Sequence, residues 1–145
     1  MSESVPNVAT LMFIAYRSIE NRVFAALAEG GFGEVTVAQG RLLARIGPQG
    51  NRLTDLAEQS QITKQTAGFL VDQLERAGYV ERIADPTDGR ARLVRLAERG
   101  IRCVQIANAE AGRVELEWEN HLGARQIAQL RTIMARLREI ADPYA

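Results

Sequence analysis

A short polar run, Lys64, Gln65 and Thr66, opens a segment whose other side is apolar. The lysine carries a positive charge, and the glutamine and threonine side chains both donate and accept hydrogen bonds. Side chains of these types in the first turn of a helix suit the base edges and nearby phosphate groups of a DNA major groove. Thr54 and Thr63 stand at two expected helix starts, where a hydroxyl group caps the helix, contacts phosphate, or does both.

The helix that carries the polar run is expected over residues 63–77. Its apolar residues recur at steps of three and four and therefore share one face: Ala67, Leu70, Val71 and Leu74. Thr63 is a suitable N-cap, and Gly78 stands where a left-handed residue would end the helix. Phe69 lies on the exposed side and offers no hydrogen bond. Contact with a thymine methyl group and packing against the following hairpin are the two alternatives for its ring.

The neighbouring segments complete a winged helix-turn-helix. Residues 53–59 form a shorter amphipathic helix with Thr54 as its expected cap, and residues 60–62 have the length of the connecting turn. Two strand-like runs follow at residues 79–83 and 92–96, and the turn-forming residues 85–90 separate them. Upstream, Thr36 and Gln39 form the capping box of a helix that is expected to continue to Gly47.

The run DGRARLVRLAERG, residues 88–100, resembles the wing signature of the MarR family of bacterial transcriptional regulators, D-x-R followed by L-T-x-x-G. Residues 53–57, 63–66, 70–75 and 78–82 resemble the segments around that family's two central helices, and the resemblance covers nearly the whole chain. It implies that Arg90 at the wing tip enters the minor groove and that Asp88 holds its guanidinium group. An arginine suits a narrow, negatively charged minor groove, and a neighbouring carboxylate lowers the entropy lost in positioning it. The alternative is a turn with an exposed arginine.

Arg92 belongs to the same basic stretch, residues 89–102, which holds five arginines and one glutamate. A stretch of this kind is either the edge that faces DNA or a solvated surface. Ala97 stands where the family usually has a capping threonine, so we expect a frayed first turn at Arg99 and Gly100.

Three further helices are expected outside the winged helix, one over residues 10–29 and two after residue 98, the last ending at Pro143. None has a second apolar layer within the chain, which predicts pairing with another copy. The resemblance implies the same arrangement, a homodimer with interlocked terminal helices. We therefore expect a mainly α (α+β) fold in which residues 1–33 and 98–145 form a dimerisation region and residues 34–97 form the DNA-binding domain.

The composition is that of an ordinary globular protein, with 46% hydrophobic residues, 25% charged residues and no net charge over 145 residues. No apolar run approaches the roughly 20 residues of a membrane span. The first ten residues lack the basic start and apolar core of a signal peptide. We expect a cytoplasmic protein that joins the nucleoid when it binds DNA.

Cys103 and His121 are the only residues of their kinds, which excludes an internal disulfide and leaves a closed zinc site without enough ligands. No metal or cofactor is expected. The arginine before Cys103 is expected to lower the pKa of the thiol slightly. The family's peroxide-sensing branch, however, carries its reactive cysteine near the N-terminal helix, so we interpret Cys103 as a structural thiol.

The resemblance also implies a small aromatic or phenolic effector, bound between the dimer helices and the winged helix. Phe13, Tyr16 and Trp118 are the candidate lining residues, with a role in the core as the alternative. No catalytic triad, Cys-His pair, phosphate-binding glycine loop or carboxylate pair is present, so an enzyme is not predicted.

These patterns together favour a homodimeric regulator that binds double-stranded DNA at a palindromic operator and acts as a repressor relieved by a small ligand. Two alternatives stay open from the sequence. One is a protein-interaction module that keeps the winged-helix fold without a specific operator, which the apolar Phe69 and the near-neutral reading surface favour. The other is a transcriptional activator.

Overall fold

The computed structural model describes residues 4–142, so the predicted helix end at Pro143 lies outside the described residues. The elements are α1 (Val8–Glu29), α2 (Val37–Leu43), α3 (Leu53–Gln59), α4 (Lys64–Arg76), β1 (Val80–Asp85), β2 (Asp88–Leu96), α5 (Glu98–Leu122) and α6 (Ala124–Ala141). This mainly helical chain with one antiparallel hairpin confirms the predicted fold class. None of the helices in the described part is long and apolar enough to span a membrane.

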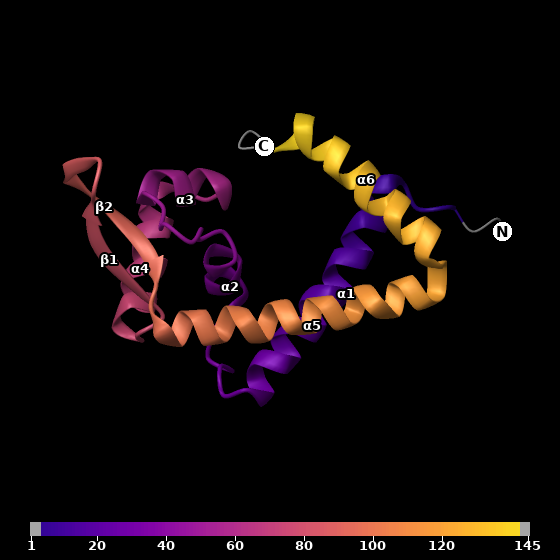
Figure 1. Ribbon diagram of the computed structural model, residues 1–145, viewed down its shortest axis with the longest axis horizontal. Coiled ribbons are helices and arrows are strands. Elements are labelled where there is room, and N and C mark those ends of the chain that lie inside the picture. Colours follow the sequence, from indigo (N-terminus) through magenta and orange to yellow (C-terminus); the bar gives the residue numbers. More distant parts are fainter. Residues whose placement is uncertain (1–3, 143–145) are drawn as a thin grey trace.

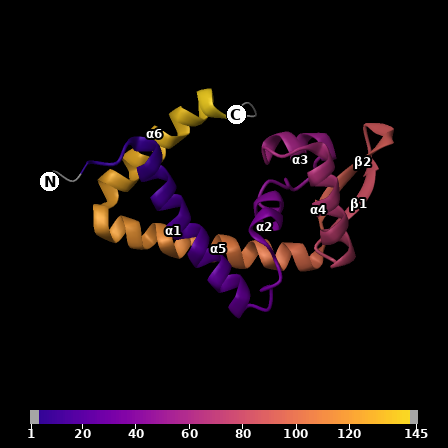
Figure 2. The ribbon, with the colours of Figure 1, turned by 180° about the vertical axis from the view of Figure 1, so that it is seen from behind.

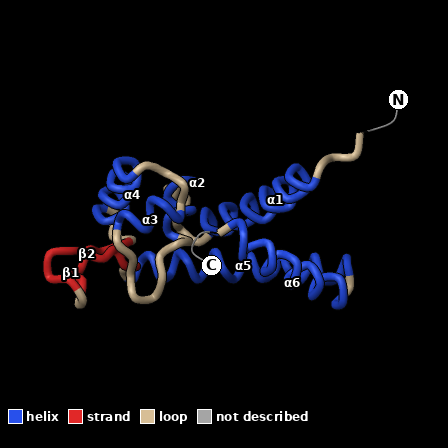
Figure 3. Tube along the Cα trace, turned by 90° about the horizontal axis from the view of Figure 1, so that it is seen from above, coloured by secondary structure: helices blue, strands red, loops and turns tan. Residues whose placement is uncertain are grey.

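The winged helix and the remaining helices occupy opposite ends of the molecule. In Figure 1, α3, α4 and the hairpin gather at one end, and α5 leads away from them as a long rod toward the turn into α6. Helix α1 packs across α5, and the view from behind shows the same crossing (Figure 2). Seen from above, the hairpin projects beyond the helices at its end, while α1 and α6 extend at the other (Figure 3). The fold thus separates the winged helix (α2, α3, α4 and the hairpin), called the reading end below, from the helical arms (α1, α5 and α6).

The core of the reading end is built from the apolar stripe of α4 and its neighbours. All four predicted stripe residues of α4 are buried, as the sequence predicted. They meet buried side chains from α2, α3, the hairpin and the residue just before it: Leu42, Leu43, Leu56, Ala57, Tyr79, Val80 and Val94. The ring of Phe32 meets that of Tyr79 edge to face, with 6.0 Å between the ring centres. This packing fixes α4 with its opposite face toward solvent.

Most helix ends follow their predicted caps. The backbone N–H of Thr66 donates to the Thr63 hydroxyl at 3.1 Å, Gly78 has φ +83°, and the Thr36–Gln39 capping box is complete. Helix α2 ends at Leu43, earlier than predicted, in hydrogen-bonded turns that reach Ile46.

The predicted cap at Thr54 is wrong. Arg52 occupies the N-cap position of α3, without a side-chain hydrogen bond to the helix, and Thr54 lies within the first turn.

The wing strands are longer than predicted. Pairing continues to Asp85 opposite Asp88, past a bulge after Ala84, so only residues 86–87 form the turn instead of residues 85–90. Asn51 adds a bridge on the other side of β2, exchanging backbone hydrogen bonds of 2.9 and 2.8 Å with Val94. The connector before α3 therefore joins the wing sheet, which the sequence did not indicate.

The start of α5 is anchored to the reading end, against the prediction of a frayed turn. The N–H of Ala97 donates to the carbonyl oxygen of Tyr79 at 2.9 Å. The Arg99 guanidinium group lies 4.5 Å from the centre of the Tyr79 ring and donates to the Ala77 carbonyl oxygen at 2.7 Å. Gly100 is buried against Tyr79. These contacts replace the missing threonine cap.

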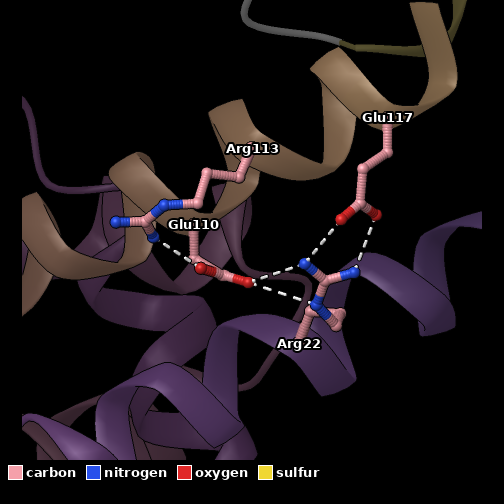
Figure 4. A network of polar contacts seen from close by, with 4 residues as sticks. All are labelled: Arg22, Glu110, Arg113 and Glu117. Carbon is pink, nitrogen blue, oxygen red and sulfur yellow. Dashed lines mark hydrogen bonds and ion pairs between the residues drawn. The ribbon is translucent and has the colours of Figure 1, made fainter. Parts of the chain in front are cut away.

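A charged network joins α1 to α5 farther along the arms (Figure 4). Arg22 on α1 donates to Glu117 at 2.8 and 3.1 Å and to Glu110 at 3.1 Å. Arg113 donates to the other oxygen of Glu110 at 2.6 Å. Arg113 and Arg22 lower the pKa of Glu110, and Arg22 lowers the pKa of Glu117.

The network predicts a loss of stability in acid. Because both carboxyl groups have pKa values below their ordinary value of 4.5, their contribution is present above that pH and is lost as the pH falls through the lowered values. Thermal unfolding between pH 6 and pH 3 should show a smaller acid loss for Glu110→Gln than for wild type. Glu119→Gln, on the same helix and without an ion pair among the described residues, should behave like wild type; equal curves for all three proteins would contradict this role.

Candidate DNA-binding surface

The outward face of α4 lies opposite its buried stripe. Gln65, Phe69, Asp72 and Arg76 follow one another on this face and are all exposed. Lys64 and Thr66 are exposed beside Gln65 in the first turn. The hydroxyl proton of Thr63 is donated to the Thr66 oxygen at 2.9 Å. The Thr66 hydroxyl group therefore keeps its own proton for a partner outside the chain, while the Thr63 hydroxyl serves the helix.

Phe69 has 59% of its surface exposed. Its ring is therefore not buried against the wing, which removes one of the two alternatives for this residue. Thr54 is also exposed, although it no longer has a capping role to explain it.

The wing tip differs from expectation in one contact. The Asp88 carboxylate accepts the backbone N–H of Arg90 at 3.0 Å, and no ion pair joins it to the Arg90 guanidinium group. An aspartate two residues before its N–H partner forms a local turn, so Asp88 shapes the backbone that carries Arg90. The side chains of Arg90 and Arg92 are exposed and have no ion-pair partner within residues 4–142.

Other arginines of the basic stretch are already paired. Arg95 forms an ion pair with Glu81 across the hairpin, and Arg99 forms one with Glu34 at 2.6 Å. Among residues 4–142, the exposed cations without an ion pair at this end are therefore Arg90 and Arg92 at the wing, Lys64 and Arg76 on α4, and Arg102 near the start of α5.

The structure adds a pair that the sequence analysis missed. Asp85 is only 6% exposed and accepts hydrogen bonds from the backbone N–H of Thr87 at 2.8 Å, the Thr87 hydroxyl at 2.7 Å and Arg52 Nε at 3.0 Å. The two Thr87 bonds, followed by Arg52, lower the pKa of Asp85. Arg52 stands at the start of α3, so this pair fixes the wing turn to the helix-turn-helix. The sequence signals the turn at Asp85, but nothing local points to a partner 33 residues away.

Comparison with known proteins agrees with this geometry. Residues 34–91, which span the helix-turn-helix and the wing tip, match the model of the MarR family. A relative from Bacillus subtilis (strain 168), the uncharacterized HTH-type transcriptional regulator YkoM, is 26% identical over 119 residues, 76% of each chain. The helix-turn-helix and wing of this chain match those of the MarR family. The matching family and the fold are those of transcriptional regulators.

Solved MarR-like structures share the whole fold. CouR from Rhodococcus jostii RHA1, bound to p-coumaroyl-CoA, has a TM-score of 0.74 at 23% identity and covers 99% of this chain and 97% of its own. A mutant of S. aureus MepR, bound to an oligodeoxyribonucleotide, has a TM-score of 0.59 at 20% identity and covers 93% of this chain and 98% of its own. The predicted winged helix with flanking helices is thereby confirmed.

A cavity of about 390 Å³ lies between α1, α2 and α5. Tyr16 lines it and donates a hydrogen bond to Glu20 at 2.7 Å. Glu20 in turn accepts two hydrogen bonds from Arg41 on α2, each 3.1 Å long. Phe13 and Trp118 do not line this cavity. Of the three candidate effector residues, the structure therefore brings only Tyr16 to it.

Cys103 also lines the cavity, but its thiol group is buried. Burial raises the pKa of Cys103, with a further contribution from the Glu34 carboxylate, so the expected lowering by the preceding arginine is wrong. Within residues 4–142 no cluster of three or more metal-binding side chains occurs.

The buried thiol predicts low reactivity. At pH 8, modification of Cys103 by an aromatic disulfide reagent should be at least about 100-fold slower in the native protein than in denaturant, because local opening must come first. Absorbance of the released thiolate measures both rates. Equal rates would mean that the Cys103 thiol is accessible and would contradict its interpretation as a structural thiol.

Proposed function

We propose that this protein is a MarR-family repressor that binds double-stranded DNA sequence-specifically as a homodimer and is released by a small ligand. The observation that carries the proposal is the separation of two exposed surfaces. Unpaired cations and hydrogen-bonding groups lie at the reading end, and uncovered apolar side chains lie on the arms. The first surface suits a polyanion, and the second suits another protein.

The amount of exposed surface supports a dimer. The accessible surface of the chain is 10139 Å², whereas a compact monomer of 16.0 kDa exposes about 7,400 Å². The excess, roughly 2,700 Å², is at the upper end of what one partner buries in an obligate dimer. Exposed large apolar residues line the arms: Leu11, Met12, Phe13, Ile14, Tyr16, Leu116, Leu122, Leu130, Ile133, Met134 and Ile140.

These two surfaces suggest a separate function for each region of the chain. Residues 1–33 and 98–145 are the proposed dimerisation region, and residues 34–97 are the proposed DNA-binding domain. A two-fold dimer presents two α4 helices to successive major grooves, so the operator is approximately palindromic. The proposed contacts are Lys64, Gln65, Thr66 and Phe69 in the major groove, Thr54 and Thr63 near phosphate, and Asp88, Arg90 and Arg92 at the wing.

The proposed ligand site is the cavity that Tyr16 lines. Its Tyr16–Glu20–Arg41 chain of hydrogen bonds links α1 of the arms to α2 of the reading end. A ligand that enters this cavity changes the spacing of the two reading ends, and a pair of reading ends out of register loses part of its shared binding energy. The p-coumaroyl-CoA bound to CouR is an aromatic ligand held by a protein of the same fold, which supports this part of the proposal.

The proposal is tested by a footprint on the DNA immediately upstream of the gene for this protein. If no protection is found there, the binding site is selected from random DNA. Protection of a palindrome is the expected result, with the dimer confirmed by sedimentation. Binding should weaken with salt by a log–log slope of about −0.9 for each neutralised phosphate. A protein-interaction module, the alternative that the sequence leaves open, would select no sequence and show no such slope.

A further inference from the structure

Phe69 stands apart from the other exposed apolar residues. Between residues 38 and 100 it is the only large hydrophobic side chain that the structure leaves exposed. The remaining members of that class lie on α1, α5 and α6, at the start of α2, or before α1. A dimer formed through the arms leaves the Phe69 side chain uncovered, because α4 belongs to the opposite end of the molecule (Figure 1).

The neighbours of Phe69 define the surface around it. Gln65 lies one turn earlier on the same face of α4, next to Lys64. Asp72, about one turn later, is paired with Arg82 at 2.7 Å. The aromatic ring is thus a single apolar group within a polar face. A protein interface places such a ring in a wider apolar patch, which this face does not provide.

The major groove offers one apolar group that fits an isolated ring, the C5-methyl group of thymine. We propose that Phe69 reads a thymine methyl group in each half-site of the operator, next to the bases that Gln65 contacts. The inference rests on the proposed function and gives it a specificity: a thymine preference that comes from the methyl group and not from hydrogen bonds. Deoxyuridine pairs like thymine but lacks this methyl group, so it isolates the contact.

The test begins with an operator that the full-length protein selects from random DNA made with thymine. Each thymine is then replaced singly, and symmetrically in both half-sites, by deoxyuridine. We expect one position at which the replacement weakens binding about fourfold per half-site, or about fifteenfold for both, the value of burying one methyl group. For Phe69→Ala, thymine and deoxyuridine at this position should bind equally, which a double-mutant cycle measures.

Two controls separate the possible failures. Gln65→Ala should lose the preference at the bases that Gln65 contacts but keep the deoxyuridine effect. Phe69→Leu should keep part of that effect because its side chain is still apolar. If wild type selects no sequence, both the proposed function and this inference are overturned. If it selects an operator but Phe69→Ala keeps the same deoxyuridine effect as wild type, or wild type has none, only the reading of the methyl group is overturned.

Discussion

Replacing Arg90 with alanine is expected to weaken operator binding at least about 30-fold, since each of two wing contacts in a dimer is worth about 1 kcal/mol or more. The Arg90 side chain is exposed and has no ion-pair partner in the described part of the chain. The Asp88 carboxylate shapes the backbone beneath it by accepting a hydrogen bond from the Arg90 N–H. That backbone contact survives truncation of the side chain. Arg90→Ala should therefore keep the melting temperature and dimerisation of wild type, and fluorescence anisotropy on the selected operator measures the loss.

Arg95→Ala is the matched control, because Arg95 lies on the same strand and is also exposed. Its guanidinium group is already paired with Glu81, so its removal should change affinity by less than about threefold, as expected for an exposed ion pair. Each lost arginine that neutralised a phosphate should also reduce the log–log salt slope by about 0.9. If Arg90→Ala binds as tightly as wild type, the assignment of the wing tip to DNA is wrong.

Local patterns in the sequence predicted what local physics decides. The stripe on α4, the Thr63 cap and the left-handed Gly78 each depend on residues within one or two turns, and the structure contains all three. The family signature added the position of the wing. Its role for Arg90 stays a prediction until binding is measured.

Contacts between segments that are far apart in the sequence could not be predicted from these local patterns. Thr54 was the expected cap of α3, but Arg52 takes the N-cap position while its side chain reaches Asp85 in the wing. A helix can begin without a side-chain cap when the residue at its start is held by such a contact. The pairing of residues 52 and 85 has no signature in either segment, so neither residue was singled out.

The same limit applies to the effector residues. Helical periodicity tells which residues share a face, but it does not tell which neighbour that face meets. Tyr16 meets α2 through Glu20 and Arg41, and Phe13, less than one turn earlier on α1, does not line the cavity. The cavity itself forms only because three segments far apart in sequence converge.

Gly100→Ala is expected to destabilise the protein by about 3 kcal/mol or more, at the upper end of the cost of overpacking. A Cβ atom at this position would lie 2.0 Å from the carbonyl oxygen of Tyr79 and 3.0 Å from its carbonyl carbon. The oxygen is backbone and already accepts the N–H of Ala97, so neither partner can turn away as a flexible side chain would. Thermal unfolding at fixed protein concentration should show a melting temperature lower by on the order of 10 °C.

Gly68→Ala on α4 separates this steric effect from helix propensity. Its Cβ atom would make an ordinary contact of 3.7 Å with Leu53 Cδ2, and alanine inside a helix gains up to about 1 kcal/mol over glycine. The two substitutions are chemically identical but should shift stability in opposite directions. Equal melting temperatures for Gly100→Ala and wild type would mean that α5 does not approach Tyr79 this closely. The expected loss would explain why the wing signature from Asp88 to Gly100 ends in a glycine. At Gly100, α5 lies against the backbone of Tyr79, which follows α4, and there is no room for a side chain.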